Sequence, residues 1–319
     1  MRVVVISAVA ALGGFLFGFD TAVINGTVTA LNETFGLDAW MSGFAVSNAL
    51  IGAAIGALFA GPIADKLGRV PAMRIAAVLF AVSALGSGLP FGIWDFILYR
   101  FIGGVAVGAA SVIAPAYIAE VAPAAMRGRL GTLQQLAIVT GIAVALFGNQ
   151  FIAMATDANS AMGELWGFAA WKWMFWAELV PAVAYFIGSF MIPESPRHLV
   201  KKGDTEGARS VLSGIMQGDP GAKVDEIKAS LHNQPKSSIG DLFGGKFGLL
   251  PIVWIGMFLS IFQQFVGINV VFYYSSLLWQ SVGVKEDQAL LNTTIGGITN
   301  LLTTFIAIAL VDKIGRKPL

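Results

Sequence analysis

The sequence contains no cysteine and only two histidines in 319 residues. Without cysteine the chain has no disulfide, no thiolate metal ligand and no thiol nucleophile. The histidines, His198 and His232, do not form the His-x-x-x-His spacing that binds zinc on a helix. The sequence also shows no pairing of a nucleophile with a base. We therefore expect no metal, no cofactor and no enzymatic activity.

Charged residues are also scarce. They make up 12% of the chain, whereas about a quarter of a soluble domain is charged. Hydrophobic residues make up 56%, and the mean hydropathy is +0.75. A soluble protein could not bury that much apolar surface, and a net charge of +1 gives no field that attracts nucleic acid. The sequence therefore predicts an all-α polytopic protein of the lipid bilayer, with no nucleic-acid partner.

Several stretches are long and apolar enough to cross a bilayer as helices, which takes about 20 residues each. They cover residues 3–30, 42–63, 72–91, 95–119, 130–154, 169–192, 249–279 and 289–311. The first stretch resembles a signal peptide at its start, but it is too long and carries Asp20. We interpret it as the first of eight spans.

The basic residues outside these spans predict the orientation. With the N-terminus inside, only Lys172 and Lys285 of the 20 basic residues fall in external loops. Cytoplasmic loops carry the excess of Lys and Arg, so we expect a cytoplasmic N-terminus. The polar segment 193–248 is then a cytoplasmic linker, in which short amphipathic helices are expected; a disordered loop is the alternative.

A short repeat indicates two tandem units. The run Asp65–Arg69 follows the second span, and the near-identical run Asp312–Arg316 follows the eighth. Equivalent positions in two units predict a six-plus-six architecture. The chain then divides into a six-helix unit at 1–192, the linker at 193–248, and the start of a second unit at 249–319. On this interpretation it is a fragment or a truncated product; an intact eight-span protein is the alternative.

Three ionisable residues stand out in the interior of the predicted spans. Asp20 is in the first span, Arg100 in the fourth and Glu178 in the sixth. Charges inside a membrane are costly and usually functional. Protonation of Asp20 would release Arg100 towards Glu178, which would make a proton switch. A static ion pair that fixes helix packing is the alternative.

The other polar residues of the spans are neutral amides with aromatic neighbours. Gln135 lies in the fifth span, Gln263, Gln264 and Asn269 in the seventh, and Asn292 in the eighth, with Tyr273 and Tyr274 nearby. Amides both donate and accept hydrogen bonds, as the hydroxyls of a sugar require. The cluster predicts a site for a neutral polyhydroxylated solute. Hydrogen bonding between neighbouring helices is the alternative.

Four motifs carry a family resemblance. Residues Gly61–Arg69 resemble the cytoplasmic loop motif of the major facilitator superfamily. Arg100–Gly104, Pro193–Arg197 and Gln263–Asn269 resemble motifs of its sugar porter family, which includes facilitative glucose transporters and bacterial proton–sugar symporters. The resemblance implies a major facilitator fold of twelve spans, of which about eight are present, and a bacterial inner-membrane location.

The resemblance also implies roles for particular residues. Sugar contacts in the family correspond to Gln135, Gln263, Gln264, Asn269 and Asn292, with Phe17, Tyr273 and Tyr274 nearby. Its symporters have an acid at the position of Asp20, with partners at Arg100 and Glu178, and this favours the proton switch. Conformational gating is implied for a set in the cytoplasmic loops: Asp65, Arg69, Arg127, Arg129, Glu194, Arg197, Asp312 and Arg316.

One position departs from the family pattern. Where the xylose symporters of the family have a second amide, seven residues after Gln135, this chain has Ile142. The substrate class is therefore a hexose or a pentose. We expect a monomeric secondary transporter that works by alternating access, with the proton as a co-substrate. A facilitative sugar uniporter and a membrane sugar sensor are the alternatives.

Overall fold

The structure is a computed structural model, and it describes residues 2–123, 126–216, 218–232, 239–244 and 248–314. Nearly all of its regular structure is helical. The first part of the chain contains α1 (Arg2–Val23), η1 (Ile24–Gly26), α2 (Val28–Phe35), α3 (Ala39–Leu67), α4 (Arg69–Gly88), α5 (Ile93–Val121), α6 (Arg127–Met154), α7 (Ala170–Trp176) and α8 (Leu179–Gly188). The second part contains α9 (Pro196–Lys201), α10 (Thr205–Ile215), α11 (Pro220–His232), η2 (Ile239–Leu242), α12 (Pro251–Phe265), α13 (Ile268–Ser281) and α14 (Glu286–Ile314).

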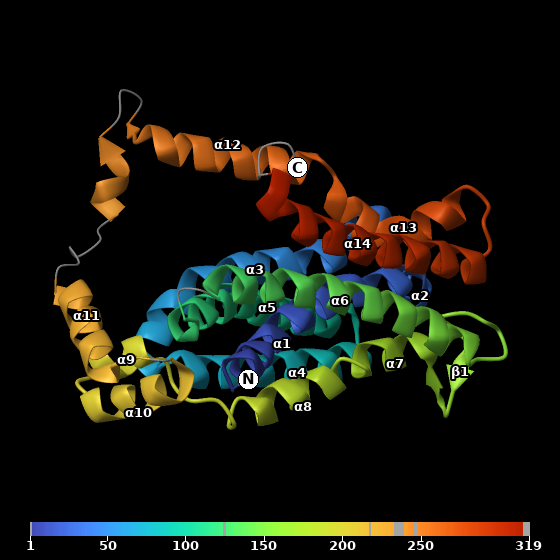
Figure 1. The fold of residues 1–319 in the computed structure, drawn as a ribbon. Helices are drawn as coiled ribbons and strands as arrows, with labels where there is room; N and C mark the ends of the chain where they lie inside the picture. Colours follow the sequence, from blue (N-terminus) through green and yellow to red (C-terminus); the bar gives the residue numbers. More distant parts are fainter. Residues whose placement is uncertain (1, 124–125, 217, 233–238, 245–247, 315–319) are drawn as a thin grey trace.

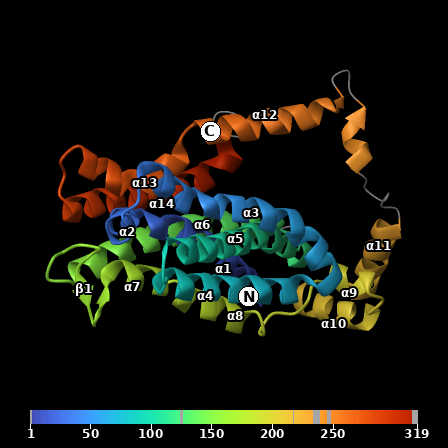
Figure 2. The same ribbon diagram turned by 180° about the vertical axis from the view of Figure 1, so that it is seen from behind.

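The helices form one bundle with a second group laid on one of its faces. Helices α1 to α8 make the bundle, and α13 and α14 lie along the side opposite α4 and α8 (Figures 1 and 2). The antiparallel hairpin of β1 (Glu164–Leu165) and β2 (Phe168–Ala169) marks one end, called here the hairpin end. Helices α9 to α11 gather at the opposite end, called here the linker end.

The predicted spans correspond to helices of the structure, with changes at three places. Within the described residues, seven helical segments are long and apolar enough to span a membrane. The predicted span 169–192 instead consists of the two short helices α7 and α8, which are interrupted at Ala177–Glu178. The predicted span 249–279 consists of α12 and α13, which meet at Val266–Gly267. The first span ends at Gly26, and α2 follows as a separate helix.

The break between α12 and α13 has a local cause. Gly267 adopts a left-handed conformation with φ of 79°, which glycine accepts without a steric cost and other residues avoid. A continuous apolar sequence gives no sign of such a break, because hydropathy does not depend on backbone direction.

Small residues let the helices of the bundle approach closely. A Cβ added at Gly52 or Gly56 of α3 would meet the backbone of Phe101 or Val105 on α5. In the other direction, a Cβ at Gly104 would meet the backbone of Ala49. Small residues at such positions are typical of helix packing in membranes, where backbone-to-backbone contact replaces the hydrophobic effect.

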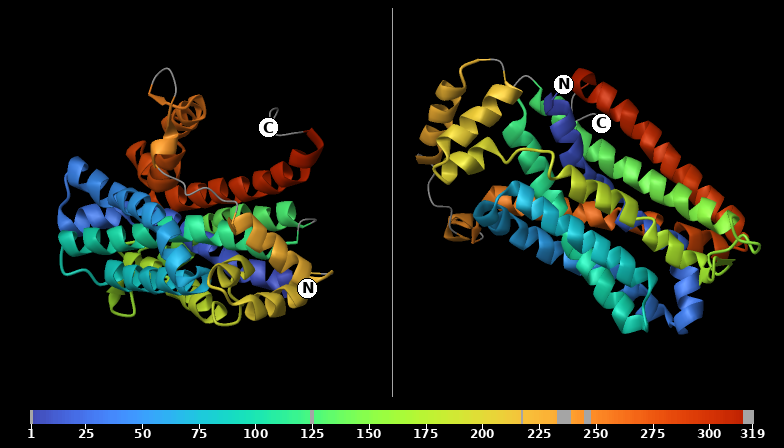
Figure 3. Two further views of the ribbon diagram at one scale, coloured as in Figure 1. Left: turned by 90° about the vertical axis from the view of Figure 1, so that its left-hand side faces the viewer. Right: turned by 90° about the horizontal axis from the view of Figure 1, so that it is seen from below.

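The apolar surface of the bundle is consistent with a surrounding bilayer. Large side chains such as Leu58, Val180 and Met191 are more than 70% exposed. In water these side chains would form apolar patches far larger than soluble monomers tolerate. Helix α12 has no buried residue within the described chain, and it lies apart from the bundle, as the end view also shows (Figure 3).

Candidate functional site

The candidate site is built around an ion pair between α1 and α5. Asp20 and Arg100 are only 1% and 2% exposed, and the Nη1 of Arg100 lies 2.6 Å from the Oδ1 of Asp20. The Nη2 of Arg100 also donates to the backbone carbonyl of Asp20 at 3.2 Å. Two charges leave water at a high cost, which only a close and well-bonded pair repays. The pair therefore ties α1 to α5.

The third predicted charge, Glu178, lies at the break between α7 and α8. It is fully buried, and neither carboxylate oxygen has a hydrogen-bond partner among the described residues. It is nevertheless within electrostatic reach of both Asp20 and Arg100. The Nε of Arg100 also has no hydrogen-bond partner in this part of the chain. Arg100 thus bonds Asp20 and leaves the nearby carboxylate of Glu178 without a bond from it.

A cavity of about 130 Å³ lies beside the ion pair. Asp20 and Arg100 line it together with Phe17 and Tyr273, two of the predicted sugar-site residues. Helix α13, which carries Tyr273, reaches this cavity from the second helical group. The structure therefore brings the predicted proton site and part of the predicted sugar site to one small space.

The predicted amides are only partly gathered. The Nδ2 of Asn269 donates to the Oε1 of Gln264 at 2.7 Å, across the break between α12 and α13. Gln135 and Gln263 are exposed, on α6 and α12 respectively. Asn292 on α14 and Tyr274 on α13 are half-buried. The amide pair therefore holds the break, while the other amides do not form a closed site.

The two helical groups are tied together at the hairpin end by residues that the sequence did not single out as functional. Asn25 of η1 donates from Nδ2 to the Phe272 carbonyl at 2.8 Å and to Ser275 Oγ at 2.9 Å. Its Oδ1 accepts from the Ser276 N–H at 3.2 Å. Near the hairpin, Glu286 of α14 accepts from Ser160 Oγ at 2.6 Å and from the Ala161 N–H at 2.9 Å. In the sequence, Asn25 is marked only as an amide at the end of an apolar stretch, and this does not indicate a contact with α13.

The predicted gating residues of the linker end form one network. Arg69 lies 2.7 Å from Asp65 and 3.0 Å from Glu120, and Lys201 lies 3.0 Å from Asp65. Glu194 accepts from the backbone N–H groups of Arg69 and Val70 at 3.0 and 3.1 Å, at the first turn of α4. The sequence analysis did not identify Glu120 and Lys201 as part of this network. Each is a charged residue at a helix end, and the sequence does not reveal which residue it pairs with.

The remaining gating candidates that fall within a described helix lie on α6, α9 and the end of α14. Arg129 is exposed on α6, and Arg197 is half-buried on α9. The side chains of Arg127, Asp312 and Arg316 lie outside the described residues.

Comparison with known proteins places the chain in a family. The sequence model of the family described as "Sugar (and other) transporter" matches residues 6–319. The chain belongs to this sugar transporter family. It is 59% identical to the glucose transport protein of Synechocystis, over 99% of this chain and 68% of that protein. It is 42% identical to the D-xylose-proton symporter of Escherichia coli, over 98% of this chain and 68% of that protein.

Solved structures of the sugar transporter family agree. The partially occluded inward-open conformation of the xylose transporter XylE from E. coli superimposes with a TM-score of 0.86 at 40% identity, covering 100% of this chain and 75% of that one. XylE bound to 6-bromo-6-deoxy-D-glucose, described as a major facilitator superfamily proton:xylose symporter, gives a TM-score of 0.83 at 42% identity. The predicted sugar porter family and all-α major facilitator fold are confirmed, and the relatives are transporters, not enzymes.

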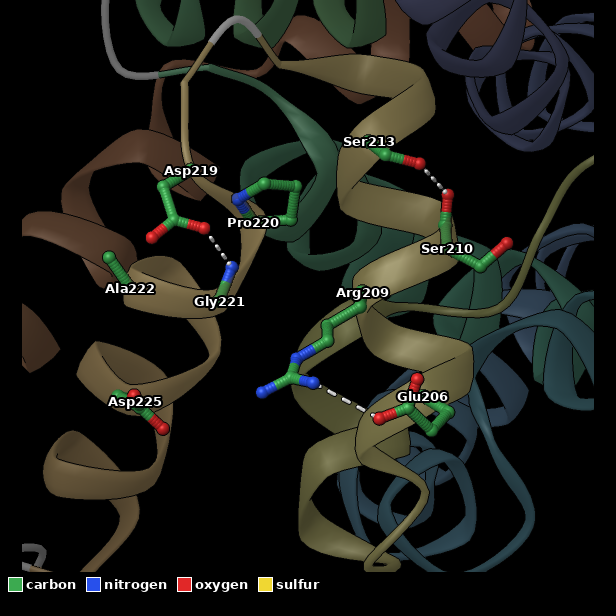
Figure 4. A pocket seen from close by; sticks show the side chains of 9 residues that line it. All are labelled: Glu206, Arg209, Ser210, Ser213, Asp219, Pro220, Gly221, Ala222 and Asp225. Carbon is green, nitrogen blue, oxygen red and sulfur yellow. Dashed lines mark hydrogen bonds and ion pairs between the residues drawn. The ribbon is translucent and has the colours of Figure 1, made fainter.

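A second and larger hollow lies away from all predicted sugar residues. It has a volume of about 780 Å³ between α10 and α11, and the side chains around it include Arg209, Ser213 and Asp225 (Figure 4). Arg209 pairs with Glu206 at 3.1 Å across one turn of α10. This hollow is an exposed groove of the linker, and its charged lining does not resemble a sugar site.

His198 is the one buried ionisable group of α9. It is 2% exposed, and neither ring nitrogen has a hydrogen-bond partner among the residues described. Burial lowers the pKa of His198 below its ordinary value of 6.5. The unfolded chain therefore binds this proton more readily than the folded protein does. The buried neutral form of His198 therefore contributes to the stability of the folded protein. The contribution is complete above pH 6.5 and is lost as the pH falls.

We predict that acidification destabilises the fold through this histidine. Lowering the pH from about 7.5 to about 5 should lower the melting temperature, and His198→Gln should lose part of that pH dependence. His232→Gln is the matched control, because His232 is exposed on α11. The measurement is thermal unfolding in detergent across this pH range. Equal pH dependence in the His198 variant and the control would contradict the prediction.

Proposed function

We propose that the protein transports a neutral monosaccharide across the cell membrane, coupled to a proton, by alternating access between its two helical groups. The observation that carries the proposal is the buried pair of Asp20 and Arg100 on a cavity that Tyr273 also lines. A change of charge at Asp20 would act directly on a space that both helical groups share.

The pair has the properties of a proton switch. When Asp20 is protonated it loses its charge, and Arg100 is left as an unpaired cation inside the membrane, which is costly. Glu178 is then the carboxylate within electrostatic reach that has no hydrogen bond to give up within the described chain. We infer that Arg100 moves from Asp20 towards Glu178, and that the cavity beside Tyr273 changes shape as a result.

The amides at the break between α12 and α13 suit the sugar. Gln264 and Asn269 bond each other in this structure, and both would have donors and acceptors to offer to hydroxyls if that bond opened. Gln135, Gln263 and Asn292 complete the proposed set, with Phe17, Tyr273 and Tyr274. The relatives of this chain include transporters of glucose, xylose, arabinose and galactose. This range supports a hexose or a pentose as the substrate class.

Facilitated transport without a proton is the second candidate. A relative that is 59% identical to this chain, from Synechocystis, is named a glucose transport protein. A fully paired Asp20 could then be a structural tie between α1 and α5. A proton gradient drives accumulation of sugar in the first candidate but not in the second, so a measurement of accumulation decides between them.

We further propose that the protein lies in a bacterial inner membrane as a monomer, with the unit 1–192 joined by the linker 193–248 to a second unit that begins at 249. The linker end faces the cytoplasm, because basic residues gather there: Lys66 and Arg69 lie where α3 meets α4, and Lys201 and Lys202 lie at the end of α9, where Lys201 pairs with Asp65. The hairpin end then faces outwards.

The orientation can be tested because the chain has no native cysteine. A single cysteine at Glu33, which is exposed on α2, should react with a membrane-impermeant thiol reagent in intact cells. A single cysteine at Lys228, exposed on α11, should react only after the cells are opened. Labelling of Lys228→Cys in intact cells would overturn the proposed orientation.

The sugar site is tested by removing the amides in the full-length protein, meaning this chain with any sequence that continues it. Gln264→Ala and Asn269→Ala should each weaken sugar binding by about 1–3 kcal/mol, because buried hydroxyls lose their partners. Asn32→Ala, an amide on α2 away from the break, is the control. Isothermal titration gives the affinities. If both variants bind as tightly as the control, the amides only hold the helix break.

Proton coupling is tested by Asp20→Asn, which keeps the shape of the side chain but cannot exchange a proton. We expect concentrative, pH-driven uptake in proteoliposomes to be lost, while exchange of sugar down its own gradient partly survives. Labelled sugar measures both activities in the same vesicles. Accumulation that persists in Asp20→Asn would favour the facilitated carrier.

A further inference from the structure

Two buried serines of α4 differ from most hydroxyls of the spans. Ser83 is 1% exposed and Ser87 is fully buried, yet neither Oγ has a hydrogen-bond partner among the described residues. Elsewhere the spans satisfy such groups within the helix: Thr21 donates to Phe17, Ser111 to Gly108 and Thr140 to Leu136. A buried hydroxyl without a partner costs stability. The absence of a bond from Ser83 and Ser87 to their own helix therefore needs an explanation.

Ser83 faces the ion pair. The point where a Cβ would stand on Gly103 of α5 lies 3.2 Å from the Oδ1 of Asp20, and Ser83 Oγ lies closer still to the same point. The hydroxyl and the carboxylate therefore both lie close to Gly103, at a point where a side chain on residue 103 would meet them. A path between the two groups requires a water molecule that hydrogen-bonds to both of them.

Ser87 extends this polar line towards the hairpin end. It lies one turn beyond Ser83, so the two hydroxyls share a face of α4. The next residue, Gly88, packs against the Nε1 of Trp176, and this nitrogen is also buried without a hydrogen-bond partner in the described chain. Leu85 and Leu89 of the same helix line a groove with Leu165 and Trp166 of the hairpin, which places this end of α4 at the hairpin.

The charged groups that face this line come from three neighbouring elements. Asp20 of α1 lies near Ser83 across Gly103, Arg100 of α5 pairs with Asp20, and Glu178 at the break between α7 and α8 is within electrostatic reach of both. The ring of Tyr99 packs on Gly86. The charges of α3, Asp65 and Lys66, lie at the linker end. Neither serine is among the residues that line the cavity of Phe17 and Tyr273.

We propose that Ser83 and Ser87 relay the proton between Asp20 and the hairpin end of α4, along a path separate from that of the sugar. This inference rests on the proposed proton coupling. A hydronium ion at the hairpin end gives up a proton and becomes water. Each hydroxyl, linked by water, accepts one proton and releases another, and an O–H bond forms on the carboxylate of Asp20. The serines are unchanged at the end, so no further reactant is needed.

The relay is tested in proteoliposomes of the full-length protein with Ser83→Ala, Ser87→Ala and the double variant. Proton-driven uptake should fall about fivefold in each single variant, which corresponds to the loss of one hydrogen bond, and further in the double variant. Exchange of labelled sugar without a proton gradient should stay unchanged. Ser260→Ala is the matched control, because that hydroxyl donates to Gly256 of its own helix and lies on α12.

A pair of nearly isosteric variants separates the hydroxyl from packing. Ser83→Thr keeps the hydroxyl and should retain proton-driven uptake, whereas Ser83→Val removes it and should lose uptake to the same extent as Ser83→Ala. Equal loss in the threonine and valine variants, or an equal fall in sugar exchange, would show a packing role and overturn the relay.

The outcomes also separate this inference from the proposed function. If the unsubstituted protein shows proton-driven uptake and the alanine variants match it, the relay is wrong and the proton coupling stands. If the unsubstituted protein shows no proton-driven uptake, the coupling fails and the relay fails with it.

Discussion

The ion pair of Asp20 and Arg100 is the constraint on which the rest of the bundle depends. Neither charge is stable alone inside a membrane, so α1 and α5 must keep the two groups within bonding distance. The 2.6 Å contact shows that they do. On α5, the helix that carries Arg100, Gly104 lets the backbone of α3 approach closely, as Gly52 does from the side of α3. A pair held this tightly changes its surroundings when one charge is removed, which suits a switch better than a loose surface pair would.

Breaks in the helices place the polar groups. Glu178 lies where α7 gives way to α8, and the bonded pair of Gln264 and Asn269 spans the turn at Gly267. Interrupted helices are tolerated at membrane depth only where protein or a cavity surrounds them, and transporters use such breaks to line their binding sites. The ties of Asn25 and Glu286 hold the second helical group at the hairpin end, while α12 lies apart from the bundle at the other.

The sequence predicted the parts of this arrangement that depend on composition. Hydropathy located the spans, and the cost of a buried charge identified Asp20 and Arg100 before any geometry was known. The breaks at Glu178 and Gly267 were missed, because apolar residues on both sides hide a change in backbone direction. Glu120, Asn25 and Ser83 were also missed as functional groups, because each depends on a partner from another helix, and one sequence does not state which helices meet.

The most direct test of the account is whether sugar movement carries protons. Proteoliposomes of the full-length protein are prepared in weak buffer, with no pH gradient and with a potassium pathway to prevent a membrane potential. Sugar is added outside while the external pH is followed. The account predicts an alkaline shift that grows with sugar concentration and is abolished when a protonophore equilibrates the two sides. Sugar uptake at a normal rate with no change in external pH would contradict it.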